Sequence, residues 1–377
     1  MTFRKYAFAI RHFRRAHALG TSAAALLGGI IFLAAFLPPA RGQAAPVTKF
    51  PVTIVLPPKL AAGQSATLAV LDADGRLAPD VTVELSSDQG STQSQVQNQV
   101  TDKVERVTTD VTGRAFFTAP SSGTVMLAKV LGVASAALIE TPPVARRGIH
   151  VPPFISQRDR FSFCGAAFRG DADANSVRLN GEGALILASS PECLILLAGP
   201  KAKPGPAMVV IDTGAAHAAA STTIVSLESE PPNPPLTPGK KSVLAVRVEG
   251  SEKLLALMVE NKTPGVLKFL RGDVQELRTS GGPVNRAQIE VASLRSGEFS
   301  FHARLASEPD PAAARRYLEA AVALAPKDSQ RTIKKLADRL KHDSRGIEKV
   351  RSELGKILSS AIAGDSRTLL EAARASL

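Results

Sequence analysis

The chain has 377 residues, which at roughly 100 to 200 residues per domain predicts two or three domains. Its composition, 44% hydrophobic and 21% charged, excludes a fully disordered, collagen-like or polytopic membrane protein. With no Trp, two Tyr and two Cys, it lacks the cysteine set of a structural zinc or iron–sulfur site and the aromatic rings on which lectins stack sugars.

The first 44 residues follow the pattern of a secretory signal. Five cations and no acid precede an uncharged run over residues 18–40. Small residues at the −3 and −1 positions, Gly42 and Ala44, predict cleavage between Ala44 and Ala45. The alternative is an uncleaved membrane anchor, because 23 uncharged residues suffice to span a hydrocarbon core of about 30 Å. We therefore expect an exported protein that is periplasmic, displayed on the cell surface or secreted.

Half of the net positive charge of the chain lies in this segment. Without its six cations, 40 Lys and Arg face 34 Asp and Glu, so the net charge falls from +12 to +6. A nucleic-acid interface needs a clustered basic face, and the sequence shows none in the remainder. Binding to nucleic acid is therefore not predicted.

Export brings the two cysteines into an oxidising compartment, where Cys164 and Cys193 can pair. A disulfide closing the 28 residues between them would stabilise the fold by about 3–4 kcal/mol in the chain-entropy account. The alternative is two buried free thiols.

Short apolar runs with turn signals about every ten residues predict a first β sandwich over residues 48–140. Asp74-Gly75 supplies a tight turn, and a polar stretch over residues 86–99 predicts an exposed loop. The expected strands cover residues 52–56, 66–71, 81–85, 114–118 and 124–130.

Two Asp/Gly turns with their flanking strands carry a resemblance to a known family. The matching segments are Gly63-Gln64-Ser65, residues 70–75, Val81-Thr82-Val83 and residues 108–115. Together they resemble bacterial Ig-like domains of the invasin and intimin type. The resemblance implies a stalk or adhesion module on the cell envelope, and it assigns no binding residue.

A second module is expected over residues 154–229, after a proline-containing linker at residues 141–153. The segments over residues 177–181, 184–191 and 205–211 resemble an IPT/TIG-type Ig-like fold. Members of that family act as spacer or recognition domains. Cys164 and Cys193 would cross-link two strands of this module.

A second proline-rich stretch, residues 230–235, is expected as a linker to a third β sandwich over residues 236–306. Glycines at 272, 281, 282 and 297 punctuate its apolar runs. The expected strands cover residues 242–249, 254–260, 266–270, 287–292 and 298–304.

From residue 309 the apolar period changes to that of a helix. Ile333, Leu336, Ala337 and Leu340 fall at i, i+3, i+4 and i+7, and the pattern predicts three helices and a short fourth in a bundle over residues 309–377. Residues 317–326 resemble the second helix of a tetratricopeptide repeat. Because solenoids need about three repeats, the alternative is a capping or oligomerising bundle.

One cluster of oxygen ligands has the spacing of a calcium loop. Asp171, Asp173, Asn175 and Glu182 occupy positions 1, 3, 5 and 12 of the EF-hand pattern. Ser176 stands where that loop needs its turn glycine, and the flanks predict strands. We interpret these residues as a polar loop and predict no metal site.

Catalytic residues are not predicted either. His150, His217, His302 and His342 fall in different modules without zinc-binding spacing, and no Gly-x-Ser-x-Gly motif is present. We predict no cofactor.

The sequence thus predicts a mainly β protein with tandem Ig-like sandwiches and a C-terminal helical bundle. The function expected from it is that of a non-catalytic envelope protein, an adhesion or spacer module with a protein or cell-surface partner. The alternative is a periplasmic scaffold whose helices bind a protein partner, and an enzyme of unrecognised type is third.

Overall fold

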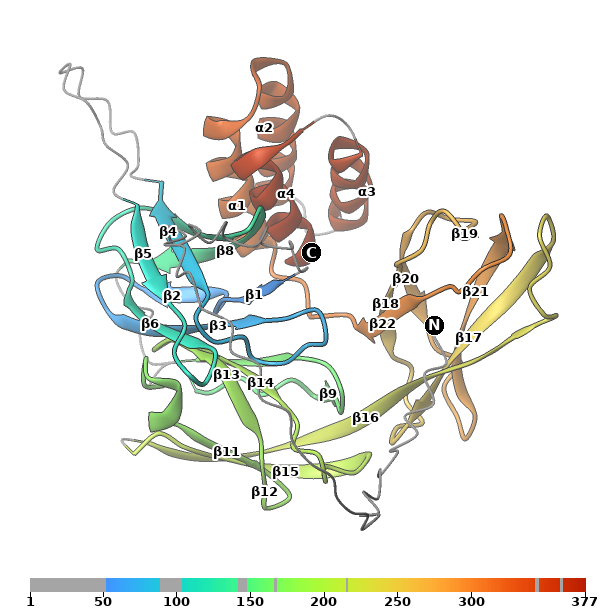
Figure 1. Ribbon diagram of the computed structural model, residues 1–377, viewed down its shortest axis with the longest axis horizontal. Coiled ribbons are helices and arrows are strands. Elements are labelled where there is room, and N and C mark those ends of the chain that lie inside the picture. The colour runs from blue at the N-terminus through green and yellow to red at the C-terminus, as the bar shows by residue number, and fades with distance from the viewer. Residues whose placement is uncertain are drawn as a thin grey trace, which may run out of the picture. The chain divides into compact units, whose positions relative to one another are not determined.

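The computed structural model describes residues 52–88, 104–141, 148–165, 168–214, 216–342, 346–359 and 362–377. These residues form β sheets followed by four C-terminal helices (Figure 1), which confirms the predicted fold class. The predicted signal, with its cleavage site at Ala44 and Ala45, lies outside the described residues. No helix among the described residues is long and apolar enough to cross a bilayer.

In the strands of the first sandwich, buried and exposed side chains alternate. In β6, Ala115 and Phe117 point into the core while Phe116 between them is exposed, as expected for a strand with one buried face. One sheet contains β1 (Thr53–Val55), β3 (Ser65–Leu71) and β6 (Arg114–Thr118). The other runs in the order β2 (Lys59–Ala61), β8 (Val133–Glu140), β7 (Val125–Val130), β4 (Thr82–Ser87) and β5 (Glu105–Thr108).

The second sandwich joins the first through a shared sheet, because Thr67 in β3 pairs with Ser189 in β13. That sheet continues through β13 (Leu185–Ser189), β14 (Cys193–Leu197) and β10 (Phe161–Cys164). The second sheet contains β12 (Glu182–Gly183), β11 (Ser176–Leu179), β15 (Gly205–Asp212), the first half of β16 (His217–Asn233) and β9 (Phe154–Ser156). Between them lies an apolar core that includes Phe163, Leu194 and Ile224.

The third sandwich has its own apolar core, which includes Val225, Leu257 and Phe269. One sheet contains the second half of β16 with β17 (Lys241–Glu249), β21 (Asn285–Ser293) and β19 (Leu267–Phe269). The other contains β20 (Val274–Arg278), β18 (Ala256–Asn261) and β22 (Phe301–Leu305).

Strand β16 belongs to two sandwiches. Residues 217–224 pair with β15 and residues 226–233 pair with β17, so Ile224 and Val225 enter the cores of neighbouring sandwiches. The prediction of a linker at residues 230–235 is therefore wrong for residues 230–233, which belong to β16. The register of β16 shifts between Glu230 and Asn233, where the two prolines lie, and a strand tolerates proline at such an irregularity.

The four helices are α1 (Pro311–Leu324), α2 (Lys327–His342), α3 (Ile347–Leu358) and α4 (Gly364–Ala375). Asp310 caps α1 by accepting a hydrogen bond from the Ala313 N–H at 2.9 Å. The helices share one apolar core with Val125, Leu127 and Leu138 of β7 and β8. The helical tail thus packs against the first sandwich, although it follows the third in the chain.

A disulfide joins Cys164 and Cys193. The two residues lie directly opposite each other in the antiparallel pair β10 and β14. The pairing is the one predicted from compartment, and it links two strands of the second sandwich.

Candidate functional site

A cavity of about 1050 Å³ lies where the three sandwiches and the helical tail meet. Its wall is partly apolar, with Ile54 of β1 and Ala136 of β8 from the first sandwich, and Leu254 and Leu255 from the loop before β18. Residues from β2, β9, β10, β14, β22, α1 and α4 and from the loops between them also line the cavity.

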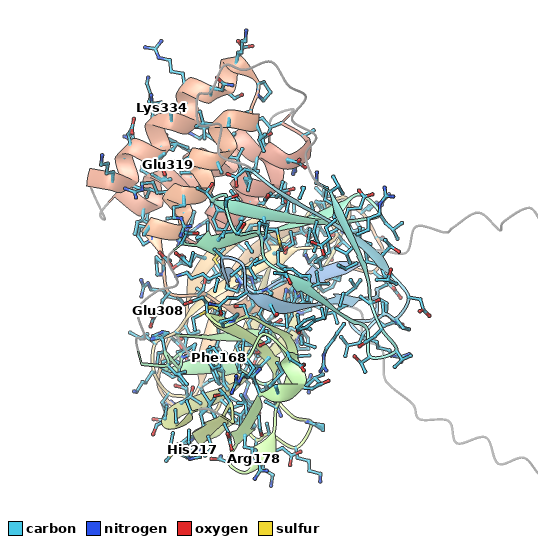
Figure 2. All side chains as sticks on the ribbon, turned by 90° about the vertical axis from the view of Figure 1, so that its left-hand side faces the viewer. Phe168, Arg178, His217, Glu308, Glu319 and Lys334 are labelled. Atoms are coloured by element: carbon cyan, nitrogen blue, oxygen red, sulfur yellow. A yellow bond between two sulfur atoms is a disulfide. The ribbon has the colours of Figure 1, made fainter. Side chains whose placement is uncertain are left out.

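An ion pair and a contact between a histidine and a carboxylate lie in the wall of this cavity. Lys59 Nζ lies 3.0 Å from Asp310 Oδ2, which connects β2 to the start of α1. His150 Nε2 lies 3.4 Å from Glu308 Oε2. Glu308 is labelled in Figure 2, near the chain segment that leads into the helices.

The two remaining acids of the lining also have partners. Asp159 Oδ1 lies 3.2 Å from His302 Nε2, and Glu371 Oε1 lies 2.9 Å from Arg367 Nε on the same helix. All four carboxylates of the lining are therefore engaged by a cation or an imidazole.

Two cations of the lining are not engaged in this way. Arg160, just before β10, and Arg304 on β22 form no ion pair or hydrogen bond with any other described residue. Loss of surrounding water lowers the pKa of Arg160. The charge of Asp159 opposes this lowering, and the charge of Arg304 adds to it less strongly than Asp159 opposes it. The residue Arg160 as a whole is exposed to solvent, and Arg304 is partly exposed.

On the α1 side of the cavity, burial and hydrogen bonding set the protonation states of Tyr317 and Asp310. Burial raises the pKa of Tyr317 far above its usual value, and its hydroxyl lies 3.4 Å from the carbonyl oxygens of Pro58 and Ala136. Burial also opposes ionisation of Asp310, but hydrogen bonds from Ala313 and Lys59 outweigh it and hold the pKa below its usual value. Near neutral pH this side therefore carries a neutral phenol and a charged carboxylate.

The residues with calcium-loop spacing have other roles. Asp171 caps the short 3-10 helix Ala172–Ala174, and Asp173 pairs with Arg114 of the first sandwich at 2.6 Å. The Asn175 side chain accepts a hydrogen bond from the Arg169 N–H through Oδ1 and donates one from Nδ2 to the Arg169 carbonyl oxygen, each at 2.9 Å. Within the described ranges, no three His, Cys, Asp or Glu side chains gather as a metal site would require.

A basic face on α2 was missed by the sequence analysis, which found no clustered cations after residue 44. Its cations share one side of the helix and are exposed, and none forms an ion pair with another described residue. One exposed acid, Asp338, lies on the same side. Lys334 is labelled on this helix in Figure 2. In the sequence these cations occur at i, i+4, i+7, i+8 and i+14, a spacing that places them on one side of a helix and could have predicted the face. The residues are Lys327, Arg331, Lys334, Lys335 and Lys341.

No family model matches the sequence, and no curated protein matches it significantly. Among solved structures, the extracellular region of plexin A4 is similar over 71% of this chain, with 11% identity and a TM-score of 0.27, and this chain spans 24% of its length. A titin I9–I11 tandem is similar over 68% of this chain and 95% of that one, with 12% identity and a TM-score of 0.17. The N-terminal four Ig domains of a Dscam1 isoform are similar over 66% and 73%, with 12% identity and a TM-score of 0.19.

TM-scores of this size carry no argument about this chain. The assignment of β sandwiches rests on its own strand pairing and buried cores. The resemblances to invasin-type and IPT/TIG-type domains stay predictions.

Proposed function

We propose that this chain is a non-catalytic, exported envelope protein whose tandem Ig-like sandwiches act as an adhesion or spacer module for a protein or cell-surface partner. The observation that supports it most is strand β16, which is shared by the second and third sandwiches. A shared strand, unlike a flexible linker, restricts hinge motion between two modules, as a spacer requires. The disulfide supports an oxidising location.

Export and anchoring are tested together on intact cells. Protease is added outside the cells, and the N-terminus of the surviving protein is determined by mass spectrometry. An N-terminus at Ala45 with the chain digested from outside supports a released or surface-displayed module. An intact N-terminus with a chain that is protected until the outer envelope is opened supports anchoring through residues 18–40.

A second candidate, a scaffold whose helices bind a protein partner, is favoured by the basic face of α2. Such a face suits an acidic protein surface. The two candidates differ in which part of the molecule contacts the partner. Beads coated with the chain are tested for adhesion to cells, and the charge of each part is reversed in turn.

The helical variant is K327E/R331E/K334E, and the matched sandwich variant is R178E/K240E/K241E. Each reverses three exposed cations that have no ion pair with a described residue, so the change in net charge is the same. Adhesion lost only in the helical variant favours the scaffold. Adhesion that is kept in both, or lost only in the sandwich variant, favours the Ig-like modules.

The non-catalytic part of the proposal has its own test. The purified chain is assayed against peptide, ester and glycoside substrates. A hydrolytic activity that a single His or carboxylate substitution abolishes would replace this proposal with an enzyme.

A further inference from the structure

We infer that the cavity between the sandwiches and the helical tail binds an amphiphilic anion. Its carboxylate or phosphate group would lie between the guanidiniums of Arg160 and Arg304, and its apolar part would contact Leu254. This inference goes beyond the adhesion or spacer role and does not depend on it.

Two arginines of the lining are left without an ion pair or hydrogen bond from a described residue, and they are the groups that an anion would contact. The four acids, Asp159, Glu308, Asp310 and Glu371, each have a partner at 2.9 to 3.4 Å. Arg160 and Arg304 line the same cavity and have no acceptor among the described residues. The charge of Arg304 disfavours the charge of Arg160, although Asp159 favours it more strongly. An anion with two or more oxygens would accept charge-assisted hydrogen bonds from both guanidiniums.

The apolar part of the ligand follows from the neighbouring loop. The Ala306 N–H donates to the Ala256 carbonyl oxygen at 2.9 Å, so the end of β22 that follows Arg304 lies beside the start of β18. Leu254 and Leu255 directly precede that start and line the cavity. Leu254 is 66% exposed, and an apolar tail placed over it would remove this surface from water.

The size of the cavity is compatible with such a ligand, since sites for small molecules occupy about 300–1,000 Å³. The head group alone does not identify the source, because a fatty acid offers a carboxylate and a phospholipid offers a phosphate. Guanidinium binds both with similar geometry. The probes below therefore include one of each.

The test is isothermal titration of the full chain with laurate and with dodecyl phosphate, each below the concentration at which it forms micelles. We expect saturable binding of at least one of them, and the tighter of the two identifies the head group. R160Q and R304Q are each expected to weaken binding about 10-fold, since a charge-assisted hydrogen bond is removed. L254S should weaken binding as well, because it removes the apolar contact with the alkyl chain of the ligand.

Several controls make the result decisive. R178Q removes an exposed cation of β11 that lies outside the cavity and should leave binding unchanged. Because neither arginine side chain forms an ion pair or hydrogen bond with another described residue, R160Q and R304Q should keep the thermal midpoint of the wild type, which separates binding from folding. Equal affinity for dodecanol would overturn the role of the arginines, and equal affinity for acetate or inorganic phosphate would overturn the role of the tail. The absence of saturable binding to either amphiphile would overturn the proposal.

Discussion

Gly170 lies directly against the backbone of Ser65, so that a Cβ atom at Gly170 would overlap the Ser65 carbonyl oxygen. The contact joins the second sandwich to β3 of the first, and the Thr67 hydroxyl donates to the Gly170 carbonyl oxygen beside it at 2.7 Å. We expect G170A to force the two sandwiches apart and to lower the free energy of unfolding by about 1–3 kcal/mol. Urea unfolding measures this.

The matched control for that variant is G183A. Gly183 lies in a strand, has no atom within 4 Å of its hypothetical Cβ, and does not need a positive φ. Its replacement should be neutral or stabilise by a few tenths of a kcal/mol up to about 1. Equal losses in the two variants would show that the contact with Ser65 is unimportant.

The helical tail is held to the first sandwich by Arg316. Its guanidinium donates to Glu140 Oε1 at 2.8 Å and to the Ile139 carbonyl oxygen at 2.6 Å, and the two charged side chains are 26% and 15% exposed. R316Q should cost about 1–2 kcal/mol, because a largely buried carboxylate loses its partner. R106Q, which breaks a pair that is 70% and 45% exposed, should cost under about 0.5 kcal/mol in the same urea experiment.

Packing inside the helical tail predicts a larger loss of stability than the loss expected for R316Q. Leu318 on α1 is fully buried in the core that the helices share with β7 and β8, whereas Leu324 on the same helix is 48% exposed. L318A should destabilise by about 2–5 kcal/mol through lost contacts and a residual cavity. L324A should change stability far less. A similar thermal midpoint for both variants would contradict the packing described.

The disulfide predicts a dependence on reducing agent. C164A/C193A opens a loop with a sequence separation of 29 and should lose about 3–4 kcal/mol of stability. Dithiothreitol should lower the thermal midpoint of the wild type and leave that of the double variant unchanged. If dithiothreitol lowered the thermal midpoint of both proteins, its effect would not come from reduction of this disulfide.

Asp310 gives a prediction for pH. Because its pKa in the folded protein is lowered, its charge contributes stability above the unfolded pKa of about 3.9, and this contribution is lost as pH falls through the folded value. D310N keeps a side chain that caps α1 but removes the charge beside Lys59. We expect the wild type to be more stable at pH 7 by under about 1 kcal/mol, since the pair is partly exposed. Urea unfolding at pH 7, 5, 3 and 2 should show the difference disappear below pH 4, and a constant difference would contradict the assignment.

The apolar runs predicted β1, β3, β4, β6 and β7 of the first sandwich and β17, β18, β19, β21 and β22 of the third, but not β9, β10, β14 or the long strand β16. β21 alternates buried and less buried residues along its length, and β17 follows the same pattern over most of its residues. The pattern failed for β2 and β5, which are short, and for β8, where Ala and Ser reduce the contrast between faces. β20 was missed because charged and polar side chains occupy most of it.

The cavity could not be predicted in this way, because no local pattern records contacts between distant segments. The pair of Lys59 with Asp310 joins residues that are 251 positions apart. One signal for the docked tail was present. β7 is buried at five of its six positions, and a strand that is apolar on successive positions must be covered on both faces.

The covered face of β7 also has a consequence for biosynthesis. Val125 and Leu127 leave the ribosome well before the helices that bury them, which begin at Pro311. At about 5–20 residues per second, an apolar sheet face stays without its cover for a time on the order of 10 s or more. During that interval the nascent chain presents a surface that molecular chaperones recognise, and the last helices to be synthesised end this exposure.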